Sequence, residues 1–201
     1  PVFSHMSETE AEVNGCKERY GKSPVVLLDE LGMYDFGGGG FHCVWFDDQD
    51  LEIYKKKGLY AVLNAGSNLK LASGIAPAAK YFREGINVAI GTDGAGSNNS
   101  LDMFREMYMD TVLSNVVEKD AAAVDPFNVL KAATTGGALA MGLKDSDILA
   151  AGKKADFIRL NMKDPAMQPE NNIINNIVYS GSKALVKMTV VAGKILYEDG
   201  K

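Results

Sequence analysis

The sequence has 201 residues, and its 26 acidic side chains outnumber its 21 basic ones, which gives a net charge of −5. This balance argues against a nucleic-acid partner, because no basic stripe is present to neutralise phosphates. No apolar run approaches the roughly 20 residues that a membrane-spanning helix needs. The two cysteines are too few for a disulfide framework. We therefore expect a cytoplasmic protein with a small-molecule partner, and with neither nucleic acid nor a membrane among its partners.

The beginning of the chain predicts a strand followed by helices. Residues 1–6 form an apolar, strand-like run, and residues 7–21 place acidic residues first and basic residues last, as suits a helix dipole. Ser23 followed by Pro24 predicts the start of a second helix. The four glycines at 37–40 predict a loop.

The alternation of strand and helix continues to residue 119. A second strand is expected at 41–46, after which Asp47 caps a helix that ends at Gly58. The remaining predicted elements of this part are a third strand at 59–66, a loop at 67–77, a helix at 78–85, a fourth strand at 87–94 and a long helix at 100–119 capped by Ser100. Such an alternation predicts a parallel sheet with covering helices.

The pattern changes after two further predicted helices, at 125–134 and 136–142. Short strand candidates separated by turn residues follow, at 155–162, 176–180, 186–193 and 194–200. We therefore expect two domains, an α/β domain over 1–147 and a small β unit over 148–201.

Three side chains suited to metal or acid–base chemistry lie at equivalent places in the predicted strands. His5 and His42 are the chain's two histidines, each in an apolar strand just before a polar loop or helix, and Asp93 follows the fourth strand. The carboxyl ends of parallel strands gather at one rim, where α/β folds carry their chemistry. Glu8 lies three residues after His5, close enough for its carboxylate to reach the same rim.

Each of these residues, taken singly, also has an ordinary structural interpretation. A lone histidine near a strand end is often only a hydrogen-bonding residue, and the aspartate of a TDG segment is a common turn former. Glu8 alone is typical of the first turn of a helix. The equivalent placement of His5, His42 and Asp93 is the observation that favours a site.

Six segments, in chain order, resemble the metal-dependent amidohydrolase superfamily. They read HMSETEAEV, FHCVWFDDQDLEI, NAGSNLKLASGIAP, IGTDGAGSNNSLDMFREM, KAATTGGALAMGL and GKKADFIRLNM. Within the superfamily they look like the branch of 5-methylthioadenosine/S-adenosylhomocysteine deaminases and triazine chlorohydrolase-like enzymes. The resemblance spans essentially the whole chain, and it is specific for the branch rather than for the substrate.

This resemblance implies a (β/α)₈ TIM-type barrel with a small β-sandwich, and it places the chain at barrel strands five to eight, the C-terminal half, plus part of the sandwich. His5 resembles the metal ligand of the fifth strand, and Asp93 resembles the ligand of the eighth strand that also handles protons. Glu8 resembles the carboxylate that exchanges a proton with a ring nitrogen. His42 resembles the sixth-strand histidine that polarises the surroundings of the attacked carbon. The segments SNLKL and GIAP match the loop after strand seven, and we expect them to frame the active site.

The activity that the resemblance implies is hydrolytic deamination of an adenosine-type nucleoside, with zinc or iron as the cofactor of the intact enzyme. The family's His-x-His pair of strand one is absent from these residues, and the chain begins at Pro1 without an initiator methionine. We therefore expect an incomplete chain that is inactive alone and holds metal weakly or not at all. We expect its sheet edges to be covered by the missing N-terminal half or by another copy in a homo-oligomer.

Two other functions compete with nucleoside deamination. The first is hydrolytic removal of chloride or an amine from an s-triazine or a related heterocycle by the same groups. The second belongs to another class, a non-catalytic interaction module, and it predicts indifference to the loss of His5.

Overall fold

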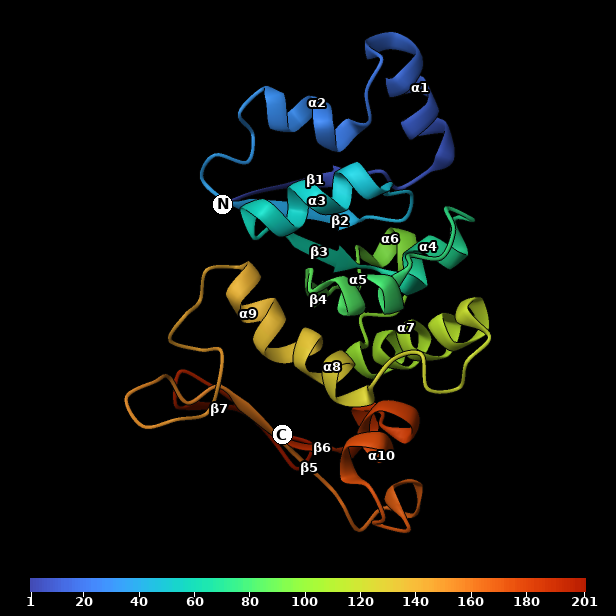
Figure 1. The fold of residues 1–201 in the computed structure, drawn as a ribbon. Helices are drawn as coiled ribbons and strands as arrows, with labels where there is room; N and C mark the ends of the chain where they lie inside the picture. Colours follow the sequence, from blue (N-terminus) through green and yellow to red (C-terminus); the bar gives the residue numbers. More distant parts are fainter.

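The computed structural model describes all residues from Pro1 to Lys201, and it contains two β-sheets (Figure 1). The first sheet is parallel and has the order β1-β2-β3-β4, with β1 (Val2–Met6), β2 (Gly38–His42), β3 (Tyr60–Leu63) and β4 (Asn87–Ile90). The second sheet is antiparallel and has the order β5-β6-β7, with β5 (Phe157–Leu160), β6 (Val186–Val191) and β7 (Lys194–Glu198). The predicted parallel sheet and the predicted β unit after it are both present.

Helices connect the parallel strands and continue after β4. Those between strands are α1 (Glu10–Tyr20) and α2 (Pro24–Glu30) after β1, α3 (Asp48–Lys57) after β2, and α4 (Ala65–Lys70) and α5 (Ala78–Glu84) after β3. After β4 come α6 (Ala95–Asn98), α7 (Met103–Glu118), α8 (Pro126–Lys131), the π-helix η1 (Ala132–Gly136) and α9 (Gly137–Ala140). The tail contains α10 (Ile173–Ser180) and the short 3-10 helices η2 (Pro165–Met167) and η3 (Lys183–Leu185). The predicted caps Ser23 and Asp47 are confirmed, because each side chain accepts a backbone N–H of its helix.

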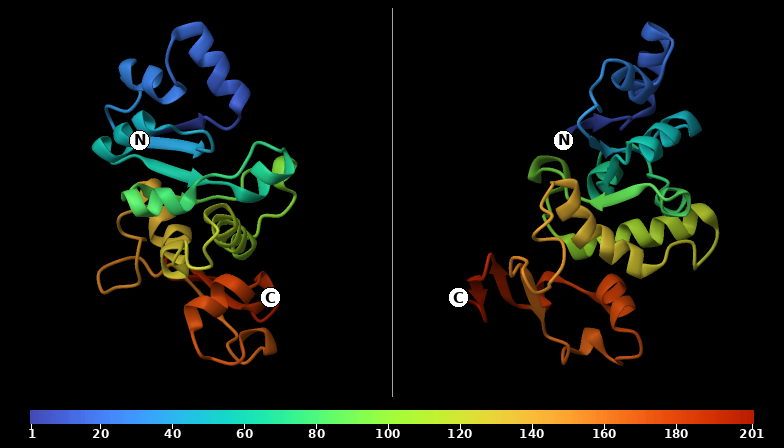
Figure 2. Two further views of the ribbon diagram at one scale, coloured as in Figure 1. Left: turned by 45° about the vertical axis from the view of Figure 1, so that its right-hand side comes forward. Right: turned by 60° about the vertical axis from the view of Figure 1, so that its left-hand side comes forward.

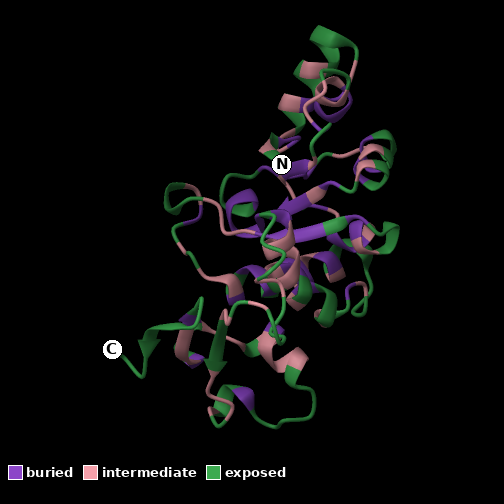
Figure 3. Cartoon of the chain, turned by 90° about the vertical axis from the view of Figure 1, so that its left-hand side faces the viewer, coloured by how far each residue is buried: buried purple, intermediate pink, exposed green.

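The register of the parallel sheet brings the carboxyl ends of its strands to one edge. Met6 pairs with His42, and Leu63 pairs with Ile90. The arrows of β2 and β3 point the same way in the left view of Figure 2. Figure 3 shows these strands largely buried, whereas β7 is exposed throughout. The buried core therefore lies around the parallel sheet. The carboxyl ends of the strands lie together at one edge of this sheet, which we call the rim.

The glycine run at 37–40 is not the predicted loop, because most of it belongs to β2. A Cβ added to Gly38 would lie 1.9 Å from the carbonyl oxygen of Val2, and one added to Gly39 would lie 2.0 Å from that of Tyr60. These distances are too short for any side chain, so β2 fits between its neighbours only as glycine. The poor strand propensity of glycine is overridden by this close approach of backbones.

Three other predictions about elements were wrong. Residues 67–70, predicted as loop, belong to α4, and residues 176–180, predicted as a strand, belong to α10, which packs against α7 and α8. A short apolar run does not by itself distinguish a strand from a buried helix. The cap of α7 is Asp102 rather than Ser100, since the Asp102 carboxylate accepts two backbone N–H groups of the first turn.

Cys16 and Cys43 are free thiols, and burial raises the pKa of the Cys43 thiol far above its ordinary value. No helix of the chain has the length and apolar character that crossing a membrane requires.

The packing of β2 predicts opposite effects of alanine at two glycines. Gly39→Ala should lower the free energy of unfolding by about 3 kcal/mol or more, because its methyl group would overlap the Tyr60 backbone. Gly15→Ala, in α1 with no atom within 4 Å of the new Cβ, should raise it by about 1 kcal/mol. Urea unfolding followed by circular dichroism measures both, and equal stability of the two variants would contradict the account of β2.

Candidate functional site

The four residues singled out in the sequence lie at the carboxyl-end rim of the parallel sheet. His5 is in β1 and His42 ends β2, and their ring centroids are 5.1 Å apart. Glu8, just after β1, places Oε2 3.7 Å from Nε2 of His42. Asp93 follows β4, and helix α4 connects it to His42.

His42 is held in a defined orientation at the end of its strand. Its side chain is buried, with the whole residue 1% exposed, and Nδ1 lies 2.7 Å from Oδ1 of Asn68 in α4. Because an amide oxygen can only accept, Nδ1 carries the proton in this contact. The Nε2 atom of the ring is therefore the one that faces Glu8.

Glu8 lies in a loop whose backbone is fixed from two directions. The backbone N–H groups of Ser7 and Glu8 donate to the Glu12 carboxylate at 2.9 and 2.8 Å. The carbonyl oxygen of Ser7 accepts two N–H groups from the chain just after β2. The Glu8 side chain is in turn held by Ser73, whose hydroxyl donates to Oε1 at 3.1 Å. One carboxylate oxygen is thus occupied, and the other faces His42.

Asp93 is held as a carboxylate at the end of the fourth strand. The hydroxyl of Ser67 donates to Oδ2 at 2.6 Å, and the backbone N–H of Gly94 donates to Oδ1 at 2.7 Å. Partial burial raises the pKa of Asp93, but the hydrogen bonds from Ser67 and Gly94 and the nearby His42 outweigh it, and the net pKa is lowered. An ionised carboxylate can accept a proton.

Left-handed backbone conformations cluster at these strand ends. Ser7 has φ of 47°, His42 73°, Cys43 50° and Asp93 56°. A positive φ is uncommon for residues other than glycine, and such strain is concentrated at functional sites in proteins. The conformation turns each chain sharply at the rim of the sheet.

Sequence reasoning assigned no individual role to three side chains that hold the site. Ser67 contacts Asp93, Asn68 contacts His42 and Ser73 contacts Glu8. All three lie in the segment that was predicted as a loop. The signal was available, because this segment follows the third strand, and polar residues after a parallel strand reach the same rim as those after its neighbours.

Two side chains at the rim are of the kinds that bind metal ions. His5 and Asp93 offer the nitrogen and oxygen donors that zinc takes in proteins. A catalytic zinc site usually has three protein ligands, and no group of three or more His, Cys, Asp or Glu side chains in this chain is placed to hold an ion. The residues present therefore fit part of a zinc site rather than a whole one.

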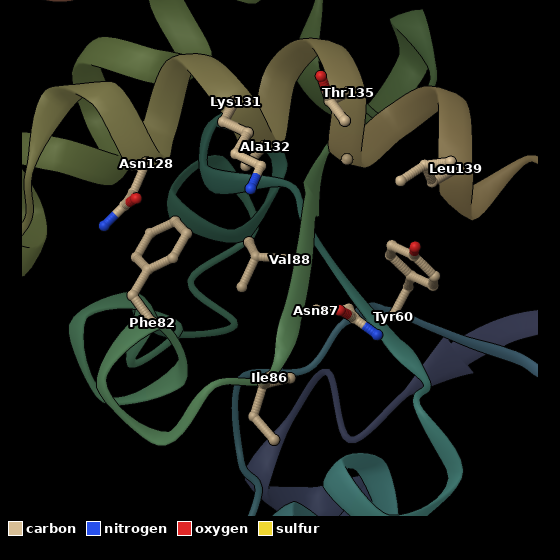
Figure 4. Close-up of a pocket in the computed structure, with 11 residues that line it drawn as sticks. Tyr60, Phe82, Ile86, Asn87, Val88, Asn128, Lys131, Ala132, Thr135 and Leu139 are labelled. Atoms are coloured by element: carbon tan, nitrogen blue, oxygen red, sulfur yellow. The ribbon is translucent and has the colours of Figure 1, made fainter. Parts of the chain in front are cut away.

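A cavity of about 210 Å³ lies away from these residues, at the amino ends of β3 and β4 (Figure 4). Tyr60 and Val88 line it from the sheet, and residues of α8, η1 and α9 close it from the other side. Its one charged lining side chain is Lys131. Since its lining contains no histidine or carboxylate, we place the candidate site at the rim and not in this cavity.

Comparison with known proteins identifies related enzymes. At 42% identity over 198 residues, the chain is similar to a 5-methylthioadenosine/S-adenosylhomocysteine deaminase of Thermococcus onnurineus, and the match covers 98% of this chain and 46% of that protein. The chain thus spans about half the length of the curated relatives it matches.

Solved structures of enzymes contain the same fold. An adenosine deaminase from Xanthomonas campestris with bound zinc is 34% identical, with a TM-score of 0.93 over 99% of this chain and 46% of that one. An atrazine chlorohydrolase from Arthrobacter aurescens TC1 complexed with zinc is 20% identical, with a TM-score of 0.89 over 98% of this chain and 44% of that one, and this likeness shows the fold alone. The fold is of the TIM-barrel α/β type. The model of the amidohydrolase family matches residues 1–196, and the chain belongs to that family.

Proposed function

We propose that this chain carries catalytic groups of a metal-dependent hydrolase that deaminates an adenosine-type nucleoside, such as methylthioadenosine or S-adenosylhomocysteine. The observation that carries the proposal is the meeting of Glu8 and His42 at 3.7 Å, with Asp93 held beside them by the same helix that holds His42. The similarity to a relative named for this activity supports it.

In the proposed reaction, His5 and Asp93 are the residues of this chain that would hold zinc. When bound, such an ion lowers the pKa of a water molecule to about 7, which makes hydroxide available at neutral pH. The remaining ligands would come from residues outside this sequence, because the donors here are too few for a catalytic site.

The chain's own residues would handle the protons. Asp93 accepts a proton from the water that attacks the ring carbon bearing the amino group. Glu8 gives a proton to the neighbouring ring nitrogen, and His42 stabilises the charge that develops beside the attacked carbon. Asp93 would then pass its proton to the amino group, so that the carbon–nitrogen bond breaks and ammonia leaves. The new hydroxyl group on the ring carbon would lose its proton to Glu8 as the carbonyl forms, which returns both carboxyl groups to their starting states. Transfers of this kind typically contribute about 10² to 10⁴ each to the rate.

We further propose that the parallel sheet is half of an eight-stranded barrel and that the antiparallel sheet is part of a β-sandwich, with residues 1–147 and 148–201 as the two units. The open order β1-β2-β3-β4 supports this, since β1 and β4 each have one strand neighbour. Residues outside this sequence or a second copy would cover those edges. Free thiols at both cysteines are in keeping with a cytoplasmic location.

Replacement of Asp93 tests the function. In the natural full-length gene product, Asp93→Asn should lower kcat for release of ammonia from methylthioadenosine by about 10² to 10⁴-fold, because the proton acceptor is lost. Asp48→Asn, at a side chain that is 90% exposed, is the matched control and should leave kcat unchanged.

The same assay decides between the functions. Release of chloride from an s-triazine without deamination of the nucleoside would favour the chlorohydrolase alternative. An interaction module would be favoured, and our proposal defeated, by two results together. The full-length product would turn over neither substrate class, and its zinc content would be the same in the wild type and in Asp93→Asn.

The protonation of Asp93 can be tested separately. Ser67→Ala should raise the pKa of Asp93 toward its ordinary value, because it removes the hydroxyl that donates to the carboxylate. Any stability that the lowered pKa contributes is present above the unfolded-state pKa of about 3.9, and is lost as pH falls through the folded-state value. Carboxyl carbon NMR measures the pKa directly. Ser73→Ala, which removes a hydroxyl bound to Glu8 instead, should leave Asp93 unchanged.

The proposed covering of the sheet edges predicts the state of the chain in solution. Light scattering of purified residues 1–201 should give a mass above 21.6 kDa, because uncovered strand edges pair with other chains. A monodisperse monomer would contradict this part of the proposal.

A further inference from the structure

A carboxylate in the middle of α7 connects two segments of the rim. Glu106 is fully buried, with 0% of the residue exposed, and its Oε2 accepts the backbone N–H of Gly66 at 2.8 Å. Its Oε1 accepts Nδ2 of Asn98 at 2.7 Å, and the same Nδ2 donates to the carbonyl oxygen of Thr92 at 2.7 Å. Glu106 thus binds the start of α4 directly and the segment before Asp93 through Asn98.

The contact with Gly66 supplies what α4 lacks. This helix has six residues, and no side chain caps its amino end. The first N–H groups of a helix have no partner within it, and so short a helix is unstable without tertiary contacts. Glu106 provides the missing acceptor from a position 40 residues later in the chain. A Cβ on Gly66 would lie 2.5 Å from Oε1 of Glu106, so the contact also requires glycine there.

The next two residues of α4 hold the acid–base groups. Ser67 donates to Asp93, and Asn68 accepts from His42. We propose that Glu106 is a positioning residue of the site, which fixes Asp93 and His42 by anchoring α4 and the segment that leads to Asp93. This inference rests on the proposed function only in its catalytic consequence, because the positioning can be measured without turnover.

The neighbouring turn of α7 offers a matched control. Asp110 lies four residues after Glu106 and is also buried, with 6% of the residue exposed. Its Oδ2 has no hydrogen-bond partner. The Asp110 side chain lines a small cavity with Asn68 of α4, but it makes no hydrogen bond to α4 or to the segment before Asp93. Replacing either carboxylate by its amide changes the same kind of group in the same helix, but only the change at Glu106 breaks the connection.

The test is nitrogen NMR of the His42 imidazole in residues 1–201, at a pH where the ring is neutral. His42 should carry its proton on Nδ1 in the wild-type chain, and His5→Ala assigns the signals of the two histidines. In Glu106→Gln the new amide faces donors on both sides, so one contact is lost and α4 is anchored less firmly. Asn68 then no longer fixes the proton on Nδ1 of His42, and the His42 signal should shift toward a mixture of the two tautomers. Asp110→Asn should leave it unchanged. Glu106→Asp, which keeps the carboxyl group and withdraws it by one methylene, should give a smaller shift and serves if the glutamine variant does not fold.

Turnover gives the second readout, in the natural full-length gene product. Glu106→Gln should lower kcat for nucleoside deamination by about 10-fold with KM within about 2-fold, as expected when groups are misplaced rather than removed. A folded Glu106→Gln or Glu106→Asp chain with the wild-type His42 signal would overturn the inference, and so would an equal shift in Asp110→Asn. A shifted His42 signal in a protein that does not deaminate nucleosides would support the positioning and defeat only the proposed function.

Discussion

Helix α4 is the constraint on which the rest of the rim depends. Its consecutive residues Ser67 and Asn68 point in different directions, as neighbours on a helix must, and one reaches Asp93 while the other reaches His42. Two strands that are not adjacent in the sheet are thereby held at a fixed separation. A shift of this one short helix would move both groups together, so the geometry of the site follows from how α4 is anchored.

The anchoring relies on a carboxyl group inside the protein. Burial raises the pKa of the Glu106 carboxyl, while hydrogen bonds from Gly66 and Asn98 oppose that rise by favouring the ionised form. Glu12 acts in a similar way on the loop that carries Glu8, through two backbone N–H groups. Donors and acceptors fixed in this way need no rearrangement when charge develops during a reaction, which is the general requirement for electrostatic catalysis.

The proposed site therefore relies on oriented acid–base groups more than on metal ligands. Glu8, His42 and Asp93 are oriented by neighbours within these 201 residues, whereas the proposed ligands His5 and Asp93 would supply only part of a zinc ligand set. Relatives that are about twice as long share this portion of the fold. The contacts that orient these three side chains are all made within this chain.

The sequence by itself determined the alternation of elements, the parallel sheet, the family and the strand-end positions of His5, His42 and Asp93, because hydrophobic period, caps and motif order are local properties of the chain. Tertiary structure decided that glycines form β2, that residues 67–70 are helical, and that Ser67, Asn68 and Ser73 hold the site. Each of these depends on an atom far away in the chain, such as the Tyr60 carbonyl or the Glu106 carboxylate. Local pattern cannot report such contacts, since their partners come together only when the strands are in register.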